Sequence, residues 1–161
     1  MLDKKTCVIA IGMGAISGMR SLSALAFMSH RLSNEMRGAR MGRATSLLMS
    51  EHVSGALTAL AAGEMVADKL PVIPARTETA PLLGRAAMGG LAGAVVADVI
   101  GSSMVPAALL GSLAAVTSTL AFYRIRKEAG ERTGIPDGVL ALLEDALVVT
   151  LGSRLSQMLV E

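Results

Sequence analysis

The sequence predicts an all-α membrane protein, a bundle of about five transmembrane helices in a single integral membrane domain. Of its 161 residues, 52% are hydrophobic and 17% are charged, whereas a soluble domain carries about 25% charged residues. The chain has 17 Gly but only Phe27, Phe122 and Tyr123 as aromatic residues. Helices that pack closely in lipid use small side chains and need little aromatic mass. We therefore expect a lipid bilayer to surround this fold.

Five apolar segments account for the predicted helices, since each span needs roughly 20 residues. Pro71 follows the second segment and Pro81 precedes the third, and the residue before a proline resists the helical conformation. Pro136 opens the last segment, with Asp137 as the expected N-cap. The predicted helices cover residues 6–27, 45–68, 82–100, 107–124 and 139–159.

The Lys and Arg residues predict the orientation, because cytoplasmic loops carry an excess of them. With five spans, the N-terminal tail and the loops 69–85 and 124–132 share one side and hold nine basic residues. The other side holds five, four of them in residues 31–43. We therefore expect a cytoplasmic N-terminus. Dual topology and a re-entrant first helix are the alternatives.

Three short segments resemble a known family. They are Gly18-Met19-Arg20-Ser21, residues 63–71 (Gly-Glu-Met-Val-Ala-Asp-Lys-Leu-Pro) and Leu143-Glu144-Asp145-Ala146. Together they are similar to the bacterial domain-of-unknown-function family 4126 of small integral membrane proteins. The Glu-x-x-x-Asp-Lys-x-Pro pattern of residues 64–71 is the most specific part, and the resemblance covers most of the chain. The resemblance implies a membrane protein and supplies no mechanism. From the apolar segments we expect a multi-pass protein of the bacterial inner membrane.

Charged residues within the predicted spans are the candidate functional residues. Such groups cost several kcal/mol in lipid unless they pair or reach water, so they indicate function. A rise of about 1.5 Å per residue sorts them into two layers. The outer layer holds Arg20, Glu51, His52, Asp98 and Arg154, and the inner layer holds Glu64, Asp68, Glu144 and Asp145.

Arg20 is expected to face the bundle interior and to pair with Glu51 or Asp98 in the outer layer. Ser17, Ser21 and Ser23 flank it. Their hydroxyls either line a polar path or bond back to carbonyls of their own helix.

Two functions fit these layers. One is a transporter or channel for a small ion or polar solute, gated by the two charged clusters. The alternative is a membrane scaffold or assembly factor, in which the charges are buried ion pairs that fix helix register. A weak internal symmetry between the two halves, with Arg20 corresponding to Arg124, would suit the inverted repeats of transporters. The identity between the halves is too low to decide this.

Several other function classes lack sequence support. A metal site at Glu51, His52 and Asp98 would have no recognisable ligand spacing. The chain has no nucleophile elbow, phosphate loop, HExxH or paired cysteines. We therefore expect no enzymatic activity, no metal and no cofactor. With two His and no basic-aromatic stretch, nucleic-acid binding is not expected either.

Small residues recur at four-residue spacing in three of the predicted helices. Such lines let helix backbones approach closely, either within the chain or in a homo-oligomer. They are Ala10, Gly14 and Gly18 in the first helix, Gly55, Ala59, Gly63 and Ala67 in the second, and Gly89, Gly93, Ala97 and Gly101 in the third.

Overall fold

The computed structural model describes residues 2–36, 38–67 and 78–161, which fold into seven α-helices without a strand. All-helical architecture is thus confirmed for the described part of the chain. The helices are α1 (Lys4–Met19), α2 (Ser23–Glu35), α3 (Arg43–Leu48), α4 (Glu51–Ala67), α5 (Thr79–Ile100), α6 (Met104–Thr133) and α7 (Asp137–Val160).

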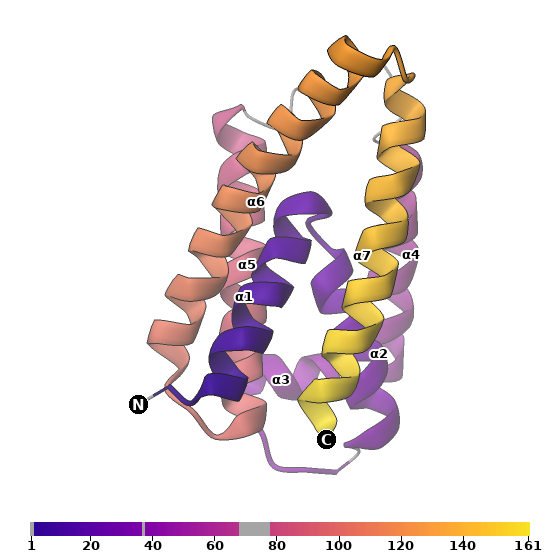
Figure 1. The fold of residues 1–161 in the computed structure, drawn as a ribbon. Coiled ribbons are helices and arrows are strands. Elements are labelled where there is room, and N and C mark those ends of the chain that lie inside the picture. Colours follow the sequence, from indigo (N-terminus) through magenta and orange to yellow (C-terminus); the bar gives the residue numbers. More distant parts are fainter. Residues whose placement is uncertain (1, 37, 68–77) are drawn as a thin grey trace.

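The first two helices form a hairpin that enters the bundle from one end and returns to it (Figure 1). The prediction of one continuous helix over residues 6–27 is therefore wrong. Arg20 adopts an extended backbone conformation after α1, and α2 begins at Ser23. We call α1 and α2 the hairpin, and residues 20–22 its tip.

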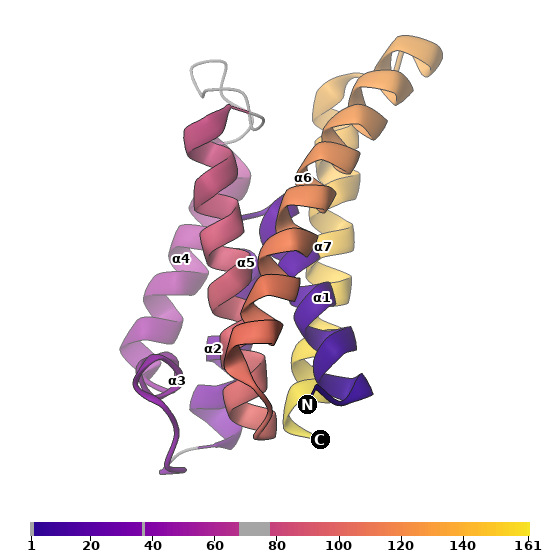
Figure 2. The ribbon, with the colours of Figure 1, turned by 90° about the vertical axis from the view of Figure 1, so that its left-hand side faces the viewer.

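Both chain termini lie at the same end of the bundle (Figure 1). We call this the termini end; it also holds α3 and the turn between α5 and α6. The turn between α6 and α7 lies at the opposite end, which we call the α6–α7 end. Helices α4 to α7 run between the two ends, as the side view in Figure 2 also shows.

Glycine contacts give the relative directions of the helices. A Cβ at Gly14 would lie 2.3 Å from the Gly111 carbonyl oxygen, and one at Gly18 would lie 2.2 Å from that of Ala115. The later residue of α1 thus meets the later residue of α6, so the two helices run parallel. Their backbones are in direct contact. Gly93 meets Ala107 in the same way across the antiparallel α5–α6 pair. The small residues of α1 and α5 therefore do serve packing within the chain.

The observed helix ends differ from the predicted ones in physically simple ways. Helix α6 begins at Met104 and places Pro106 in its first turn, where no intrahelical N–H is required. It also continues to Thr133, through the basic stretch that was predicted to be a loop. Asp137 is the first residue of α7, and Pro136 occupies the N-cap position predicted for it.

Two of the described helices, α5 and α6, are long and apolar enough to cross a membrane. Helix α4 has 17 described residues, and the longer α7 carries Glu144, Asp145 and Arg154. Many large apolar side chains on the outside of the bundle are exposed, among them Leu60, Val66, Leu83, Val105, Leu109, Leu113, Leu142 and Leu143.

Two aspartates fix elements at the termini end. Asp3 caps α1 by accepting a hydrogen bond from the Thr6 N–H at 2.7 Å. The pKa of its carboxyl lies below the ordinary value because of hydrogen bonds from the Thr6 side chain and then the Thr6 backbone. Asp98 accepts hydrogen bonds from the Gly42 N–H and the Thr45 hydroxyl, which tie the segment containing α3 to α5.

Candidate functional site

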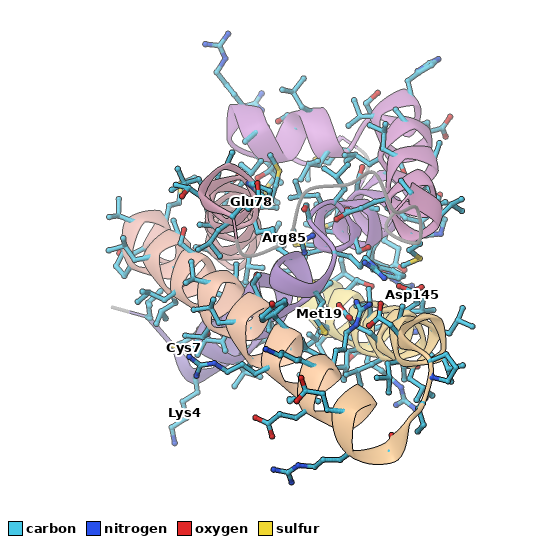
Figure 3. All side chains as sticks on the ribbon, turned by 90° about the horizontal axis from the view of Figure 1, so that it is seen from above. Lys4, Cys7, Met19, Glu78, Arg85 and Asp145 are labelled. Atoms are coloured by element: carbon cyan, nitrogen blue, oxygen red, sulfur yellow. The ribbon has the colours of Figure 1, made fainter. Side chains whose placement is uncertain are left out.

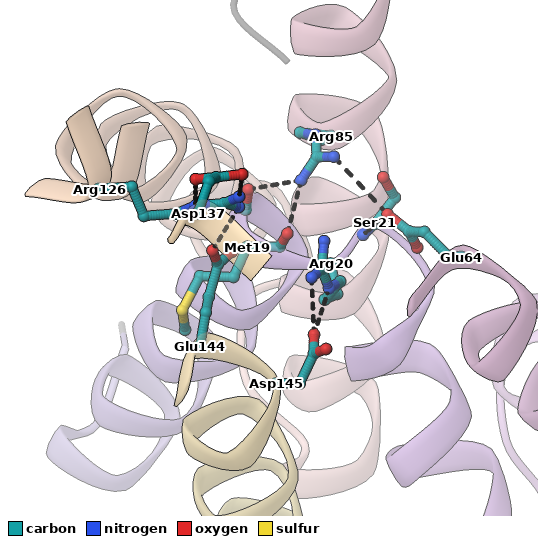
Figure 4. Close-up of polar contacts among 10 residues, drawn as sticks. Met19, Arg20, Ser21, Glu64, Arg85, Arg126, Asp137, Glu144 and Asp145 are labelled. Carbon is teal, nitrogen blue, oxygen red and sulfur yellow. Dashed lines mark hydrogen bonds and ion pairs between the residues drawn. The ribbon is translucent and has the colours of Figure 1, made fainter. Parts of the chain in front are cut away.

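The hairpin tip lies among α4, α5, α6 and α7, with Ser21 and Leu22 partly exposed. The Arg20 side chain is fully buried. Its Nε donates a hydrogen bond to Oδ1 of Asp145 on α7 at 2.7 Å, and Nη2 lies 2.7 Å from the same oxygen (Figure 4). The prediction that Arg20 faces the interior is confirmed, but its partner is Asp145 and not Glu51 or Asp98.

The start of α2 is capped by a carboxylate from another helix. Leu22 occupies the N-cap position and makes no side-chain cap. Glu64 of α4 accepts the Ser21 N–H at 2.8 Å with Oε1 and the Leu22 N–H at 3.1 Å with Oε2. A carboxylate is favoured here because a helix N-terminus carries partial positive charge and unsatisfied N–H groups.

The end of α1 is capped by cationic and hydroxyl donors. Nη1 of Arg85 on α5 donates to the carbonyl oxygens of Gly18 and Met19 at 2.7 and 2.8 Å. The Thr119 hydroxyl donates to the Gly18 carbonyl at 2.8 Å. The last carbonyls of a helix need such donors because they have no partner within the helix. Arg85 also brings Nη2 to 3.6 Å from Oε1 of Glu64, so it spans both sides of the tip.

A third arginine joins α6 to the start of α7. Nη1 of Arg126 lies 3.1 Å from Oε2 of Glu144, whose side chain is 2% exposed. Its Nη2 also contacts the exposed Asp137 at 2.6 Å (Figure 4). Arg126 therefore pairs with the buried carboxylate of Glu144, which directly precedes Asp145 in the sequence.

These contacts define one charged cluster. It consists of three arginines and three carboxylates, none with a side chain more than 20% exposed: Arg20, Arg85, Arg126, Glu64, Glu144 and Asp145. Viewed along the bundle, Met19 and Arg85 lie near the middle of the molecule, while Lys4 lies at its edge (Figure 3). These six described residues carry three positive and three negative charges, and they surround a break in the helical backbone.

The structure rearranges the two predicted layers of charge. Glu64, Glu144 and Asp145 do come together, but Arg20 joins them. Glu51 and His52 are exposed at the start of α4, Arg154 is exposed on α7, and Asp98 is engaged near α3. Asp68 lies outside the described residues. Among the described residues, no three His, Cys, Asp or Glu side chains are grouped as metal ligands would be.

The sequence placed Arg85 only as a cation near the inner layer, together with Lys69 and Arg124, and Arg126 was missed because it was assigned to a loop. Arg85 could have been singled out as a site residue, since it is the one charged residue in the run 80–97. Arg126 lies in a strongly charged stretch and gives no such signal.

Two serine hydroxyls beside the tip have no hydrogen-bond partner within the described part of the chain. They belong to Ser17 in the last turn of α1 and Ser23 at the first position of α2, and both side chains are buried. The back-bonding considered from the sequence does not occur at these two residues. Ser21 contributes its backbone N–H to Glu64.

The family model of the domain of unknown function DUF4126 matches residues 7–155. The chain belongs to the DUF4126 family. No curated protein and no solved structure matches it significantly. The three segments that carried the resemblance all contribute to the charged cluster of this DUF4126 protein: Arg20 and Ser21 from the first, Glu64 from the second, and Glu144 and Asp145 from the third.

Proposed function

We propose that this DUF4126 protein is a multi-pass protein of the bacterial inner membrane that conducts or transports a small ion or polar solute past the hairpin tip. The membrane location is supported by the length and apolar character of α5 and α6. It is also supported by the exposed leucines and valines around the bundle, because contiguous exposed apolar surface indicates a lipid or protein partner.

The observation that carries the transport proposal is the broken hairpin at the charged cluster. Non-helical backbone at membrane depth is tolerated only where protein buries it or where it lines a cavity. Transporters use such breaks because half-helix ends present partial charges to a substrate. Here the end of α1 and the start of α2 meet at residues 20–22, between Arg85 and Glu64. The DUF4126 segments gather at this same point.

The architecture that we propose in the membrane is four crossing helices, α4 to α7, with the hairpin as a re-entrant element. This replaces the expected five spans. It also removes the basis for a cytoplasmic N-terminus, because the start of α1, which carries Lys4 and Lys5, lies at the same end of the bundle as α3. When Lys4 and Lys5 are counted on the other side of the membrane, the nine and five basic residues of the two sides become seven and seven.

Flux measurements in proteoliposomes test the proposal. Purified protein should raise the permeability of liposomes to at least one ion in a panel of H⁺, Na⁺, K⁺ and Cl⁻. Asp145→Asn should abolish that flux, because the ion pair between Arg20 and Asp145 is then lost. Glu128→Gln is the matched control: it also removes one negative charge, from an exposed side chain on α6, and flux should persist. Absence of flux for every ion, with folded protein, would contradict the proposal.

A second candidate function is a membrane scaffold or assembly factor. The specific observation in its favour is that each arginine of the charged cluster makes an ion pair with a carboxylate of the cluster. Removing one partner of a buried pair is strongly destabilising. If Asp145→Asn loses thermal stability and the wild-type protein shows no flux, this candidate is favoured.

We also propose that the protein forms a homo-oligomer through α4. Most of its described contacts are with α2 and α3, and Glu64 near its end also pairs with Arg85 of α5. A Cβ at Gly55 or Gly63 would meet nothing within 4 Å, and Ala59 between them is exposed. A small-residue face of this kind lets two helices approach closely in lipid. Crosslinking of an Ala59→Cys variant lacking Cys7 should give dimers, and a purely monomeric product would contradict the assignment.

A further inference from the structure

We propose that a pocket between α2 and α4 binds a membrane-soluble quinone, an uncharged ring molecule with two carbonyl oxygens. The inference goes beyond the proposed transport function, because it requires neither flux nor any change at the charged cluster. It concerns binding alone and includes no electron-transfer step.

The pocket lies where α2 packs against α4. Its volume is about 320 Å³, and no described Asp, Glu, Lys or Arg side chain lines it. Alanine, phenylalanine and methionine form most of its wall, and Ser23, His30 and Thr58 are its polar lining residues. Thr58 and Ala62 are exposed, so the pocket opens at the surface of the bundle. Pockets of this size and apolar character bind small molecules with few polar groups, and burial without a charged partner favours an uncharged one.

The buried hydroxyl of Ser23 indicates a ligand in this pocket. Ser23 is 1% exposed, and its hydroxyl makes no hydrogen bond within the described part of the chain. Thr58 differs, because its hydroxyl donates to the Ser54 carbonyl at 2.8 Å. Buried hydroxyls without a partner are uncommon, and each calls for an explanation such as a bound water or ion. A bound molecule with an acceptor oxygen would supply the same hydrogen bond.

A second polar group marks the outer end of the pocket. His30 follows Ser23 on the same face of α2, two turns and about 10.5 Å further along the helix axis. It also lines a neighbouring hollow that continues toward Asn34. A p-quinone carries its carbonyl oxygens on opposite edges of a flat apolar ring, so one oxygen can accept from Ser23 and the other from His30. Phe27, between them on α2, offers an aromatic contact to the ring.

A phospholipid is the main competing occupant, because in the proposed membrane arrangement bilayer lipid reaches the surface of the bundle. Its headgroup belongs at the membrane interface, so only an acyl chain would reach Ser23 beside the hairpin tip. An acyl chain has no acceptor oxygen and leaves the buried hydroxyl unsatisfied, which costs free energy. The Ser23 hydroxyl therefore favours a quinone over an acyl chain.

Ligand-dependent thermal unfolding of the purified full chain in detergent tests the pocket. The probe is duroquinone, whose ring is fully methylated, which blocks addition of the Cys7 thiol. The comparison is durene, a methylated ring of similar size without the carbonyl oxygens. Duroquinone should raise Tm in a saturable way, because a ligand that binds only the folded protein stabilises it. Durene should raise Tm less, and equal effects of the two compounds would overturn the proposal.

Two serine variants test the hydrogen bond. Ser23→Ala should weaken the affinity for duroquinone about fivefold, the value of one hydrogen bond. It should fold at least as well as wild type, since the hydroxyl that it removes has no partner in the described part of the chain. Ser17→Ala is the matched control, because it also removes a buried hydroxyl of this kind but from outside the pocket lining. Its affinity should equal that of wild type, and equal losses in both variants would contradict the assignment.

A bulky substitution tests the location independently. Ala62→Phe should remove the saturable rise in Tm, because Ala62 lines the pocket. Ala56→Phe is its control, since Ala56 is exposed on the same helix but is not a lining residue. Binding that survives Ala62→Phe would overturn the location. Loss of copurified phospholipid from Ala62→Phe, with no duroquinone binding by wild type, would assign the pocket to lipid and overturn the proposal.

The flux assay separates this inference from the proposed function. Duroquinone binding without flux of any ion would keep the pocket assignment and remove the transport function. Flux without duroquinone binding would do the reverse.

Discussion

The guanidinium of Arg20 and the carboxylate of Asp145 lie 2.7 Å apart, although 125 residues separate them in the chain. This pair fastens the hairpin tip to α7. A hydrogen bond with both partners charged is shorter and about twice as strong as a neutral one. The two helices of the hairpin are short, with 16 residues in α1 and 13 in α2. The ion pair therefore helps to hold the hairpin in place.

Removal of either member of this pair should be strongly destabilising. We expect Arg20→Ala to lower the free energy of unfolding by about 3–5 kcal/mol, because the buried Asp145 then loses its ion pair with Arg20. Asp145→Ala should cost a similar amount. The double variant should lose less than the sum, since no lone charge remains. Chemical denaturation in micelles measures all three, with exposed Arg40→Ala as a control expected within about 0.5 kcal/mol of wild type. Additive losses would contradict the direct pairing.

A pair of threonines on α6 tests the capping of α1. Thr119 donates its hydroxyl to the Gly18 carbonyl across helices, whereas exposed Thr117 bonds only within its own helix. Thr119→Val should cost about 1 kcal/mol, the net value of one hydrogen bond, and Thr117→Val should cost little. Thermal unfolding of the two variants gives the comparison. Equal effects would mean that the interhelical bond adds no stability.

Glycine substitutions separate packing within the chain from packing between chains. A Cβ at Gly14 would lie 2.3 Å from the Gly111 carbonyl oxygen, but one at Gly63 would meet nothing within 4 Å. Gly14→Ala should therefore destabilise the fold by about 1–3 kcal/mol through overpacking. Gly63→Ala should leave the monomer as stable or slightly more stable, because alanine favours helix. Tm values of both variants check this, and a large loss for Gly63→Ala would indicate a contact made in an oligomer.

Cysteine labelling tests the re-entrant hairpin. In a Cys7→Ala background, Lys4→Cys and Ser103→Cys should react with an impermeant reagent from the same side of the membrane, and Glu131→Cys from the other. All three native side chains are exposed. Five spans would instead place residues 4 and 131 together. Labelling of each site from both sides would indicate dual topology. Intact cells and inverted vesicles provide the two orientations.

The long helices were largely predictable because their apolar runs and prolines are local signals. The predicted segments 82–100 and 139–159 lie within α5 and α7. The error at α6 came from treating residues 124–132 as a loop. Charged residues are good helix formers, and Glu128 and Arg132 even pair at four-residue spacing on that helix.

The break at residues 20–22 could not be read from the sequence around it. That stretch has no proline, and α2 has no capping side chain of its own. The groups that satisfy the broken backbone come from distant helices: Glu64, Arg85 and Thr119. A backbone conformation that depends on tertiary partners leaves little trace in local sequence.

The predicted partner of Arg20 was wrong because the N-terminus was placed at the wrong end of the bundle. The depth estimate placed the N-terminus at the same end as the 124–132 segment, so Arg20 seemed far from Asp145. In the structure α1 begins at the termini end instead. Asp145 lies in the third turn of α7, counted from the α6–α7 end. The length of α1 therefore brings Arg20 toward the level of Asp145. The candidates included Arg20, Glu64, Glu144 and Asp145 of the charged cluster, but the side of entry decided which charged residues meet.

A ribosome that has just completed α2 has made Arg20 but none of the carboxylates that neutralise the hairpin tip. Asp145 follows Arg20 by 125 residues, which takes about 6–25 s at 5–20 residues per second. An isolated hairpin with a bare arginine at its apex enters a hydrocarbon layer only at high cost. In the membrane arrangement that we propose, the hairpin is therefore expected to reach its place only after Asp145 of α7 has been synthesised.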